Sequence, residues 1–444
     1  MKNKVFWFAL MIITNVVHAQ TTMSLSEAQL YAANNSYLVK TSELEIEKAN
    51  KQLWEITAIG LPQIKANVDY SYSPQIPQQP IPAEFFGGQP GEFVAVAFGV
   101  EHNSQASVAL NQLIFDGAYL LARKGSELLK KIRYNEYEKT KVDVKEAVSQ
   151  AYFNASLAFE AEKIIENNLE LLNNNLKEVT ALFDAGFVEE QDAEQLEYLV
   201  NSLQSDLENV RRSKTLSLEL LKFTIGMPLE IDLQLSENLT VLNDQIVVSE
   251  LIQSESYDFS NNVNFKLISN QEIGATLALK RESWSFAPVV SGFISHSQSS
   301  FSNDGFNLFN YNQYWIPATV MGFNVSVPLF TSGQRLMRVA QAKIELKEVQ
   351  LAKFQISESL KLEFNKAKSD YLYALEKLKN EERNKNISNS ILKKTLVKYS
   401  EGLSSSLDVT QVQNQYLATE NSYLNSLLNV LIAKSKLERL AGRN

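Results

Sequence analysis

The sequence contains the same unit twice, and this repeat restricts the fold more than any other feature. Gly186 and Gly226 recur as Gly402 and Gly442, a shift of 216 residues in both cases (402 minus 186, for example). The apolar positions between the glycines also coincide, and their three-four spacing is typical of helices packed as in a coiled coil. Because repeated units adopt the same fold, we expect the same elements in the same order in both halves.

Each half contains two segments with a strand pattern. In the first segment, apolar residues such as Ile64 and Val68 alternate with polar ones such as Lys65. This period of two predicts a β-strand with one apolar and one polar face. The second half repeats both segments: Pro288 matches Pro62 in the first strand, and Phe330 matches Phe115 in the second. We predict strands over 61–73 and 104–115 in the first half and over 287–298 and 319–330 in the second.

A long helical pattern follows the second strand of each half. It covers residues 118–185 and 334–401, which are 68 residues each. At 1.5 Å per residue each helix is roughly 100 Å long. Shorter helices follow the glycine turns, over 187–225 and 403–441, and another precedes each first strand, over 24–59 and about 258–286. Two short helices placed end to end are about as long as one long helix. This suggests a wall in which continuous helices stand beside pairs of shorter ones. The two repeats then span 20–242 and 243–444.

The connection between the two strands differs in composition from the strands. Residues 73–93 are rich in Pro, Gly and Gln, so we predict a long exposed loop. Residues 299–317 take the same place in the second half and are rich in aromatic residues. Aromatic residues at this place suit a membrane-interface belt, although an ordinary cluster of loop residues gives the same pattern.

The N-terminus predicts export from the cytoplasm. Lys2 and Lys4 precede an apolar run over 5–13, and Val17-His18-Ala19 forms a small-residue cleavage site. We interpret residues 1–19 as a signal peptide. A membrane anchor is the alternative, but the apolar run is much shorter than the ~20 residues that a helical span needs.

Composition argues against several classes of function. The formal net charge is −9 and the pI is about 5.2, whereas a nucleic-acid-binding protein needs a basic face. The chain has no cysteine, which excludes disulfides, thiolate catalysis and cysteine-bound zinc. No phosphate-binding loop and no nucleophile-elbow motif occurs either. We therefore expect a protein that is not an enzyme and that uses no cofactor or metal.

The number of strands indicates an assembly. Each predicted strand is about as long as one that crosses a bilayer when tilted. Four strands cannot close a barrel, and open sheet edges cannot face hydrocarbon because their backbone groups would lack partners. Three copies would supply twelve strands, enough for a water-filled ring. The alternative is a small soluble sheet beside a helical bundle.

In the order, duplication and spacing of its segments, the sequence resembles the TolC-like outer-membrane efflux family. The resemblance covers nearly all of the chain after the leader. It is carried by segments such as "SLSEAQLYAANNSYL", "LPQIKANVDYSYS", "LFDAGFVEEQDA", "VPLFTSGQR" and "VKYSEGLSSSLDVTQVQNQYLATENSYLNSL". It implies a mixed fold of helices and transmembrane strands, in which a homotrimer forms a twelve-strand barrel continuous with a twelve-helix periplasmic tunnel. It also implies a periplasmic adaptor and an inner-membrane transporter as partners, and a place in the outer membrane of a Gram-negative bacterium.

The resemblance also implies two sets of site residues at the helix turns. In the family, adaptor hairpins dock on the turns, which here contain Ala185, Gly186, Phe187, Glu401, Gly402 and Leu403. The family's gate positions fall here on Tyr399, Asp408 and Gln411. Gln411 replaces a second aspartate of the family pattern, and Ser404 stands near the place of a latching arginine. One hypothesis is that three Asp408 carboxylates form a ring that favours cations. The other is that Asp408 only complements a helix dipole.

Three functions remain open from the sequence. The first is a passive outer-membrane duct of a tripartite export system, carrying small molecules such as drugs. The second is the duct of a type I protein secretion system. The third belongs to another class: a periplasmic coiled-coil scaffold or adaptor that forms no pore. A scaffold would not need four amphipathic strands placed symmetrically in two repeats.

Overall fold

The computed structural model describes residues 21–244, 259–303 and 314–441. The expected signal peptide and Gly442 lie outside these ranges. The helices are α1 (Leu25–Asn35), α2 (Tyr37–Ile59), α3 (Gly117–Asp184), α4 (Glu190–Ile225), α5 (Leu239–Asp244), α6 (Val263–Trp284), α7 (Gln334–Ser400) and α8 (Ser406–Leu440). The strands are β1 (Thr21–Met23), β2 (Gln63–Tyr72), β3 (Gln78–Pro82), β4 (Phe93–Ala97), β5 (His102–Phe115), β6 (Leu233–Leu235), β7 (Val289–Ser302) and β8 (Ile316–Ser326). In the described ranges, no helix is long and apolar enough to cross a membrane.

The chain forms two compact units, and each unit combines segments from both halves of the sequence. One comprises residues 1–46, 133–268 and 353–444, and the other comprises 47–132 and 269–352. The first unit contains the helix turns, and the second contains the main sheet. The long helices α3 and α7 contribute residues to both units.

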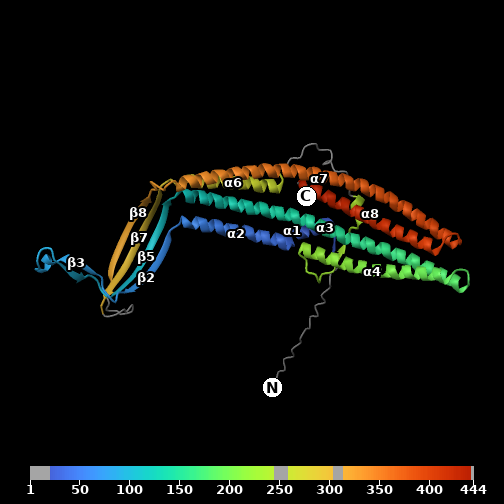
Figure 1. Cartoon of the computed structure of the whole chain (residues 1–444), viewed down its shortest axis with the longest axis horizontal. Coiled ribbons are helices and arrows are strands. Elements are labelled where there is room, and N and C mark those ends of the chain that lie inside the picture. The colour runs from blue at the N-terminus through green and yellow to red at the C-terminus, as the bar shows by residue number, and fades with distance from the viewer. Residues whose placement is uncertain (1–20, 245–258, 304–313, 442–444) are drawn as a thin grey trace, which may run out of the picture. The chain divides into compact units, whose positions relative to one another are not determined.

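The main sheet has four antiparallel strands in the order β2-β5-β7-β8 (Figure 1). Its hairpins β2–β5 and β7–β8 each come from one half of the sequence, and β5 joins them by pairing with β7. One irregularity interrupts the β5–β7 register, between Leu113 and Phe115. The strands β2 and β8 therefore form the two edges of the sheet.

The connection between β2 and β5 corrects the prediction of a plain loop. Within it, β3 and β4 pair as a separate two-stranded ribbon, with Pro80 opposite Ala95 and Pro82 opposite Phe93. Prolines are tolerated because each strand of such a ribbon has one side without a partner. In the equivalent connection of the second half, residues 304–313 lie outside the described ranges.

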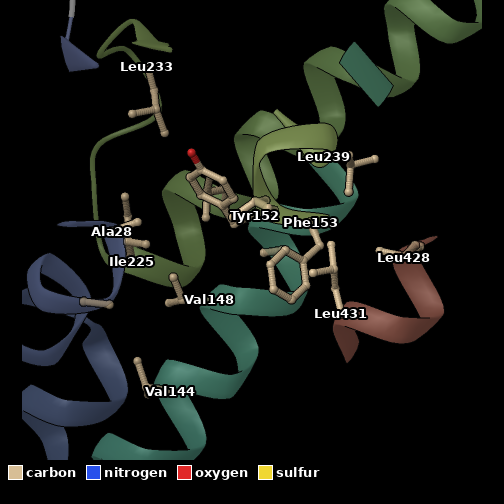
Figure 2. Packing of buried hydrophobic residues seen from close by; sticks show 14 of the residues in the cluster. Ala28, Val144, Val148, Tyr152, Phe153, Ile225, Leu233, Leu239, Leu428 and Leu431 are labelled. Carbon is tan, nitrogen blue, oxygen red and sulfur yellow. The ribbon is translucent and has the colours of Figure 1, made fainter. Parts of the chain in front are cut away.

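The unit that contains the turns is built on a buried apolar cluster. Side chains from α1, α3, α4 and α8 meet there, with Tyr152 and Phe153 of α3 close to Ile225 and Leu431 (Figure 2). The Tyr152 hydroxyl donates a hydrogen bond to the Met23 carbonyl at 3.0 Å and accepts one from the Glu237 amide at 3.3 Å. These bonds attach the short parallel ribbon β1–β6 to the helices.

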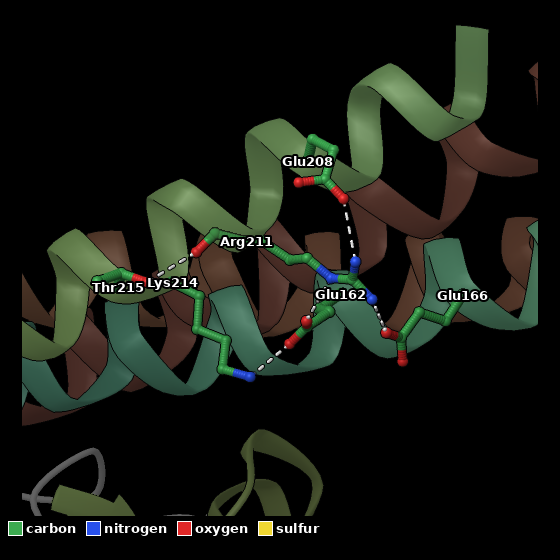
Figure 3. A network of polar contacts seen from close by, with 6 residues as sticks. All are labelled: Glu162, Glu166, Glu208, Arg211, Lys214 and Thr215. Carbon is green, nitrogen blue, oxygen red and sulfur yellow. Dashed lines mark hydrogen bonds and ion pairs between the residues drawn. The ribbon is translucent and has the colours of Figure 1, made fainter. Parts of the chain in front are cut away.

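An ion network links α3 to α4 on the surface of the same unit (Figure 3). The Arg211 guanidinium lies 3.2 Å from Glu162 and 2.9 Å from Glu166, both on α3. Lys214 adds a contact of 2.6 Å to the second oxygen of Glu162. Because Glu162 is mostly covered while Arg211 is half exposed, the network orients the helices more than it stabilises them.

The first helical segment breaks into two helices, which corrects the prediction of one helix over 24–59. Ser24 begins α1 with a capping box that includes Glu27. At Ser36 the backbone becomes extended, with ψ at 137°. The α-carbon of Gly226 packs so close to this break that an added β-carbon would lie 2.3 Å from the Asn35 carbonyl oxygen. The break is thus coupled to a contact with the end of α4.

Candidate channel-forming surfaces

The register of the main sheet sorts its side chains onto two faces. Residues directly opposite each other in a ladder point to the same face. Val68, Ala106, Gln298 and Pro317 form one such row. The next row toward the helices contains Ala66, Val108, His296 and Thr319, and the row after it, with Ile64, Leu110, Ile294 and Met321, is fully apolar. This mainly apolar face carries Ile64, Ala66, Val68, Tyr70, Val108, Leu110, Ile294, Met321, Phe323 and Val325, together with the polar residues Ser104, Gln112, His296, Gln298, Ser300 and Thr319. Several of these side chains are strongly exposed, including Ile64 at 69%, Met321 at 72% and Phe323 at 76%.

The opposite face of the same sheet is mainly polar, although it also carries apolar residues such as Phe293, Ile316 and Val320. Its rows contain Gln63, Lys65, Asn67, Asp69, Asn103, Gln105, Ser107, Asn111, Ser295, Ser297 and Ser299. In the four strands as described, Lys65 and Asp69 are the only Lys, Arg, Asp or Glu residues, and both are on β2. A sheet with one exposed apolar face and one weakly charged polar face suits a wall between lipid and water.

The two helix turns end in the same way. Gly186 and Gly402 have φ angles of 78° and 73°, in the left-handed region that glycine adopts without strain. In each turn, two backbone amides donate hydrogen bonds to carbonyls of the preceding helix. In the first turn Gly186 N donates to Phe183 O at 2.8 Å and Phe187 N to Leu182 O at 2.9 Å. In the second turn Gly402 N donates to Tyr399 O at 3.0 Å and Leu403 N to Lys398 O at 2.7 Å. This is the Schellman motif. The residues after the glycines, Phe187 and Leu403, are 79% and 77% exposed.

Asp408 lies in the first turn of α8 and caps that helix. Its carboxylate accepts hydrogen bonds from the Ser405 amide and hydroxyl, both at 2.9 Å, and from the Ser404 hydroxyl at 3.1 Å. The Asp408 amide in turn donates to the Ser405 hydroxyl at 3.2 Å. The backbone hydrogen bond from Ser405, followed by the two hydroxyls, lowers the pKa of Asp408. Gln411 lies exposed on the next turn of α8.

Tyr399 lies beside a contact between the two turns that sequence reasoning missed. The Ser406 hydroxyl, buried at the start of α8, donates to the Asp192 carboxylate on α4 and lies 2.8 Å from Gln195 Oε1. Burial, and then the charges of Asp192 and Glu178, raise the pKa of Tyr399. Its hydroxyl has no hydrogen-bond partner among the described residues. The available signal was that Asp192 is the repeat counterpart of Asp408.

A cavity of about 330 Å³ opens between these turns. It is lined by residues of both turns, including Glu178, Phe187, Asp192, Tyr399 and Ser404. The cavity therefore brings Tyr399, predicted as a gate residue, together with Phe187, predicted as a docking residue. Asp408 and Gln411 are not among its lining residues.

Comparison with known proteins gives a consistent result. Residues 279–443 match the outer membrane efflux protein family. The structure is similar to that of CusC, with a TM-score of 0.73, 15% identity, and coverage of 96% of this chain and 93% of CusC. It is also similar to VceC of Vibrio cholerae (0.69, 13% identity, 94% and 96% coverage) and to MtrE of Neisseria gonorrhoeae (0.70, 17% identity, 94% and 88% coverage). No curated protein matches the sequence.

These matches define the class of the fold, which is that of outer-membrane channels, and they locate an outer membrane efflux protein domain in the second half of the chain. The sequence resembles the TolC-like outer-membrane efflux family, and both the family match over residues 279–443 and the fold shared with CusC support this resemblance. The resemblance that the sequence motifs indicated is thereby confirmed.

Proposed function

We propose that this protein is a passive trimeric duct that carries small molecules out of the periplasm. One observation supports the proposal above all: the main sheet has an exposed apolar face, a polar face and two open edges, β2 and β8. In a bilayer, every backbone group at such an edge needs a partner. Strands of other copies can supply those partners.

Three copies make the smallest ring that is wide enough for a duct. Two copies would give a barrel of eight strands, and side chains fill the interior of a barrel of that size. Three give twelve strands and a water-filled interior. We propose that the helices of the three copies continue this barrel as a twelve-helix periplasmic tunnel. The two sequence repeats, 20–242 and 243–444, would each contribute half of the strands of a subunit.

The polar face of the sheet supports small molecules as the cargo. It is lined mainly by Ser, Asn and Gln, with Lys65 and Asp69 as single opposite charges. Such a lining holds water without concentrating solutes of one charge. The chain has no nucleotide-binding loop, so the driving energy must come from an inner-membrane transporter. We propose drug-like molecules delivered by such a transporter as the main cargo.

The helix turns support docking of a periplasmic adaptor. Phe187 and Leu403 are large, strongly exposed apolar side chains, and both occupy the same position of equivalent turns, so a subunit would present the same apolar contact twice. We propose that residues 185–187 and 401–403 contact the adaptor. We also propose that Tyr399, Asp408 and Gln411 face the tunnel's narrow end, where they would regulate passage.

Three measurements test the duct. Purified protein in detergent should sediment as a trimer, and in planar bilayers it should form conducting channels. The cells should retain it in the outer-membrane fraction after osmotic shock. Protein that is released by osmotic shock, stays monomeric and never conducts would instead indicate the scaffold or adaptor.

Cargo is tested in cells that lack the protein. Efflux of small molecules predicts that deletion increases drug susceptibility, and that plasmid-borne protein restores resistance. A type I secretion duct predicts unchanged susceptibility and the loss of a specific protein from the culture medium. The second result would replace drugs by protein as the cargo and leave the duct intact.

A further inference from the structure

The two hairpins of the main sheet have the same register once the sequence repeat is applied. β7 is the counterpart of β2, with Pro288 matching Pro62, and β8 is the counterpart of β5, with Phe330 matching Phe115. In the first hairpin Val68 lies opposite Ala106. Their counterparts Ile294 and Met321 lie opposite each other in the second. The same holds at the helix-proximal end, where Gln63 pairs with Asn111 and Val289 with Ser326.

The central ladder joins two strands whose counterparts are the sheet edges. β5 is the second strand of the first repeat, and β7 is the first strand of the second repeat. Their counterparts are β8 and β2. Within the described chain β8 and β2 pair on one side only and do not pair with each other. The β5–β7 ladder therefore shows how a strand of the β8 type pairs with a strand of the β2 type, a pairing that β8 and β2 themselves do not make within the described chain.

We propose that β8 pairs with β2 of a second copy of this chain in the register of the β5–β7 ladder. This rests on the proposed trimer and assigns its contacts. In the β5–β7 ladder Ala106 lies opposite Gln298, Val108 opposite His296 and Leu110 opposite Ile294. The counterpart pairs between subunits are Met321 with Tyr72, Phe323 with Tyr70, and Val325 with Val68.

The faces of the strands support this register independently. The residues in all three pairs belong to the apolar face, so the lipid-facing surface runs without interruption across the boundary. The adjacent pair on the polar face joins Asn324 to Asp69, as Ala109 meets Ser295 in the central ladder. A slip by one residue would place Phe323 opposite Asp69 or Ser71 and reverse both faces.

The end of β8 supports the same contact. Its counterpart β5 continues through Gln112–Phe115, where β7 pairs with it. β8 stops at Ser326, and the following residues Leu329 and Phe330 are 93% and 87% exposed. Phe115, the counterpart of Phe330, is partly buried and lies near Trp284. Pairing with a second copy is expected to extend β8 over 327–330 and to place Val327 opposite Ala66.

Pairs of cysteines test the register cleanly, because the chain contains no cysteine. The matched variants are Ala66→Cys with Val327→Cys and Val68→Cys with Val325→Cys. The control variants exchange partners: Ala66→Cys with Val325→Cys and Val68→Cys with Val327→Cys. The controls keep the same four positions on the same face but are displaced by two residues. Each is oxidised in outer membranes with a membrane-permeant catalyst and separated on denaturing gels.

The matched variants should form covalent trimers, several-fold faster than the exchanged variants. Directly opposite β-carbons lie about 4.5–5.5 Å apart, whereas diagonal ones lie about 7–8 Å apart. Faster cross-linking of an exchanged variant, or equal rates for all four, would overturn the register while unmodified protein still sediments as a trimer. Protein that gives no cross-link and sediments as a monomer would overturn the proposed trimer as well.

Discussion

The Gln413 side-chain amide donates a hydrogen bond of 2.7 Å to Asn168 Oδ1, in the buried contact between α8 and α3. Gln413 is fully buried, and Asn168 is only 6% exposed. Asn168 is further held by a 2.7 Å bond from its own amide to the Ile164 carbonyl. An amide pair among apolar helix contacts restricts the helices to one register, because any slip buries both amides without partners.

We expect Asn168→Leu to destabilise the protein by about 1–3 kcal/mol, since it leaves the Gln413 amide buried and unpaired. Adding Gln413→Leu should recover most of this loss, because both polar groups are then gone. Denaturant unfolding followed by circular dichroism measures the apparent free energy. If the double variant is as unstable as the sum of the single variants, the two amides are not coupled.

Tyr152 should make stability depend on alkaline pH. Burial raises its pKa to about 12, above its value of about 10 in the unfolded chain. Between these values the folded protein keeps a proton that the unfolded chain has lost. The contribution to stability is therefore complete below pH 10 and decreases as the pH rises to 12, by about 3 kcal/mol.

The Tyr152→Phe variant lacks this term. The difference between its free energy of unfolding and that of the wild type should shift in favour of the variant by about 3 kcal/mol between pH 10 and 12, as measured by denaturant unfolding. Below pH 10 it should be less stable than the wild type, because the Met23 carbonyl loses its donor. The exposed Tyr198→Phe variant is the control. A pH-independent difference between wild type and Tyr152→Phe would show that Tyr152 titrates normally.

Two glycines with nearly the same backbone angles should differ in their tolerance of alanine. Gly226 and Gly186 both have φ of 78°. A β-carbon at Gly186 meets nothing within 4 Å, whereas at Gly226 it would collide with the Asn35 carbonyl. Gly186→Ala should cost about 1 kcal/mol from backbone strain alone. Gly226→Ala should cost more than about 3 kcal/mol, because the α1–α2 break must move. Equal thermal shifts would show that the close contact has no energetic weight.

Asp408 distinguishes a gate from a helix cap. If three carboxylates line the narrow end, Asp408→Asn channels in planar bilayers should lose cation preference, while Glu190→Gln channels keep it. Because hydrogen bonds lower the pKa of Asp408, the charged form is favoured in the folded protein. The contribution of the charged Asp408 carboxylate to the stability of the folded protein is complete above the pKa of the unfolded chain. It disappears only as the pH falls through the lower pKa of the folded protein.

The cation preference of the wild type should therefore persist as the pH falls to about 4, the ordinary range for an aspartate. Unchanged selectivity in Asp408→Asn would leave the hydrogen bonds with Ser404 and Ser405 as the whole role of this carboxylate.

Local patterns in the sequence determined the elements of this protein. The alternation around Val68 is a strand because a period of two separates two faces, whichever strand lies beside it. Gly186 and Gly402 end the helices because few other residues adopt a positive φ without strain. Both signals depend on a few neighbouring residues, so they can be seen in a single chain segment.

The tertiary structure alone decided how these elements combine. The pairing of β5 with β7, the break at Ser36 beside Gly226, and the bond from Ser406 to Asp192 all join residues far apart in the chain. The ribbon of β3 and β4 likewise depends on the pairing of Pro80 with Ala95, which lies in another segment of the connection. Such contacts depend on which surfaces meet after the elements form, and periodicity carries no information about that choice.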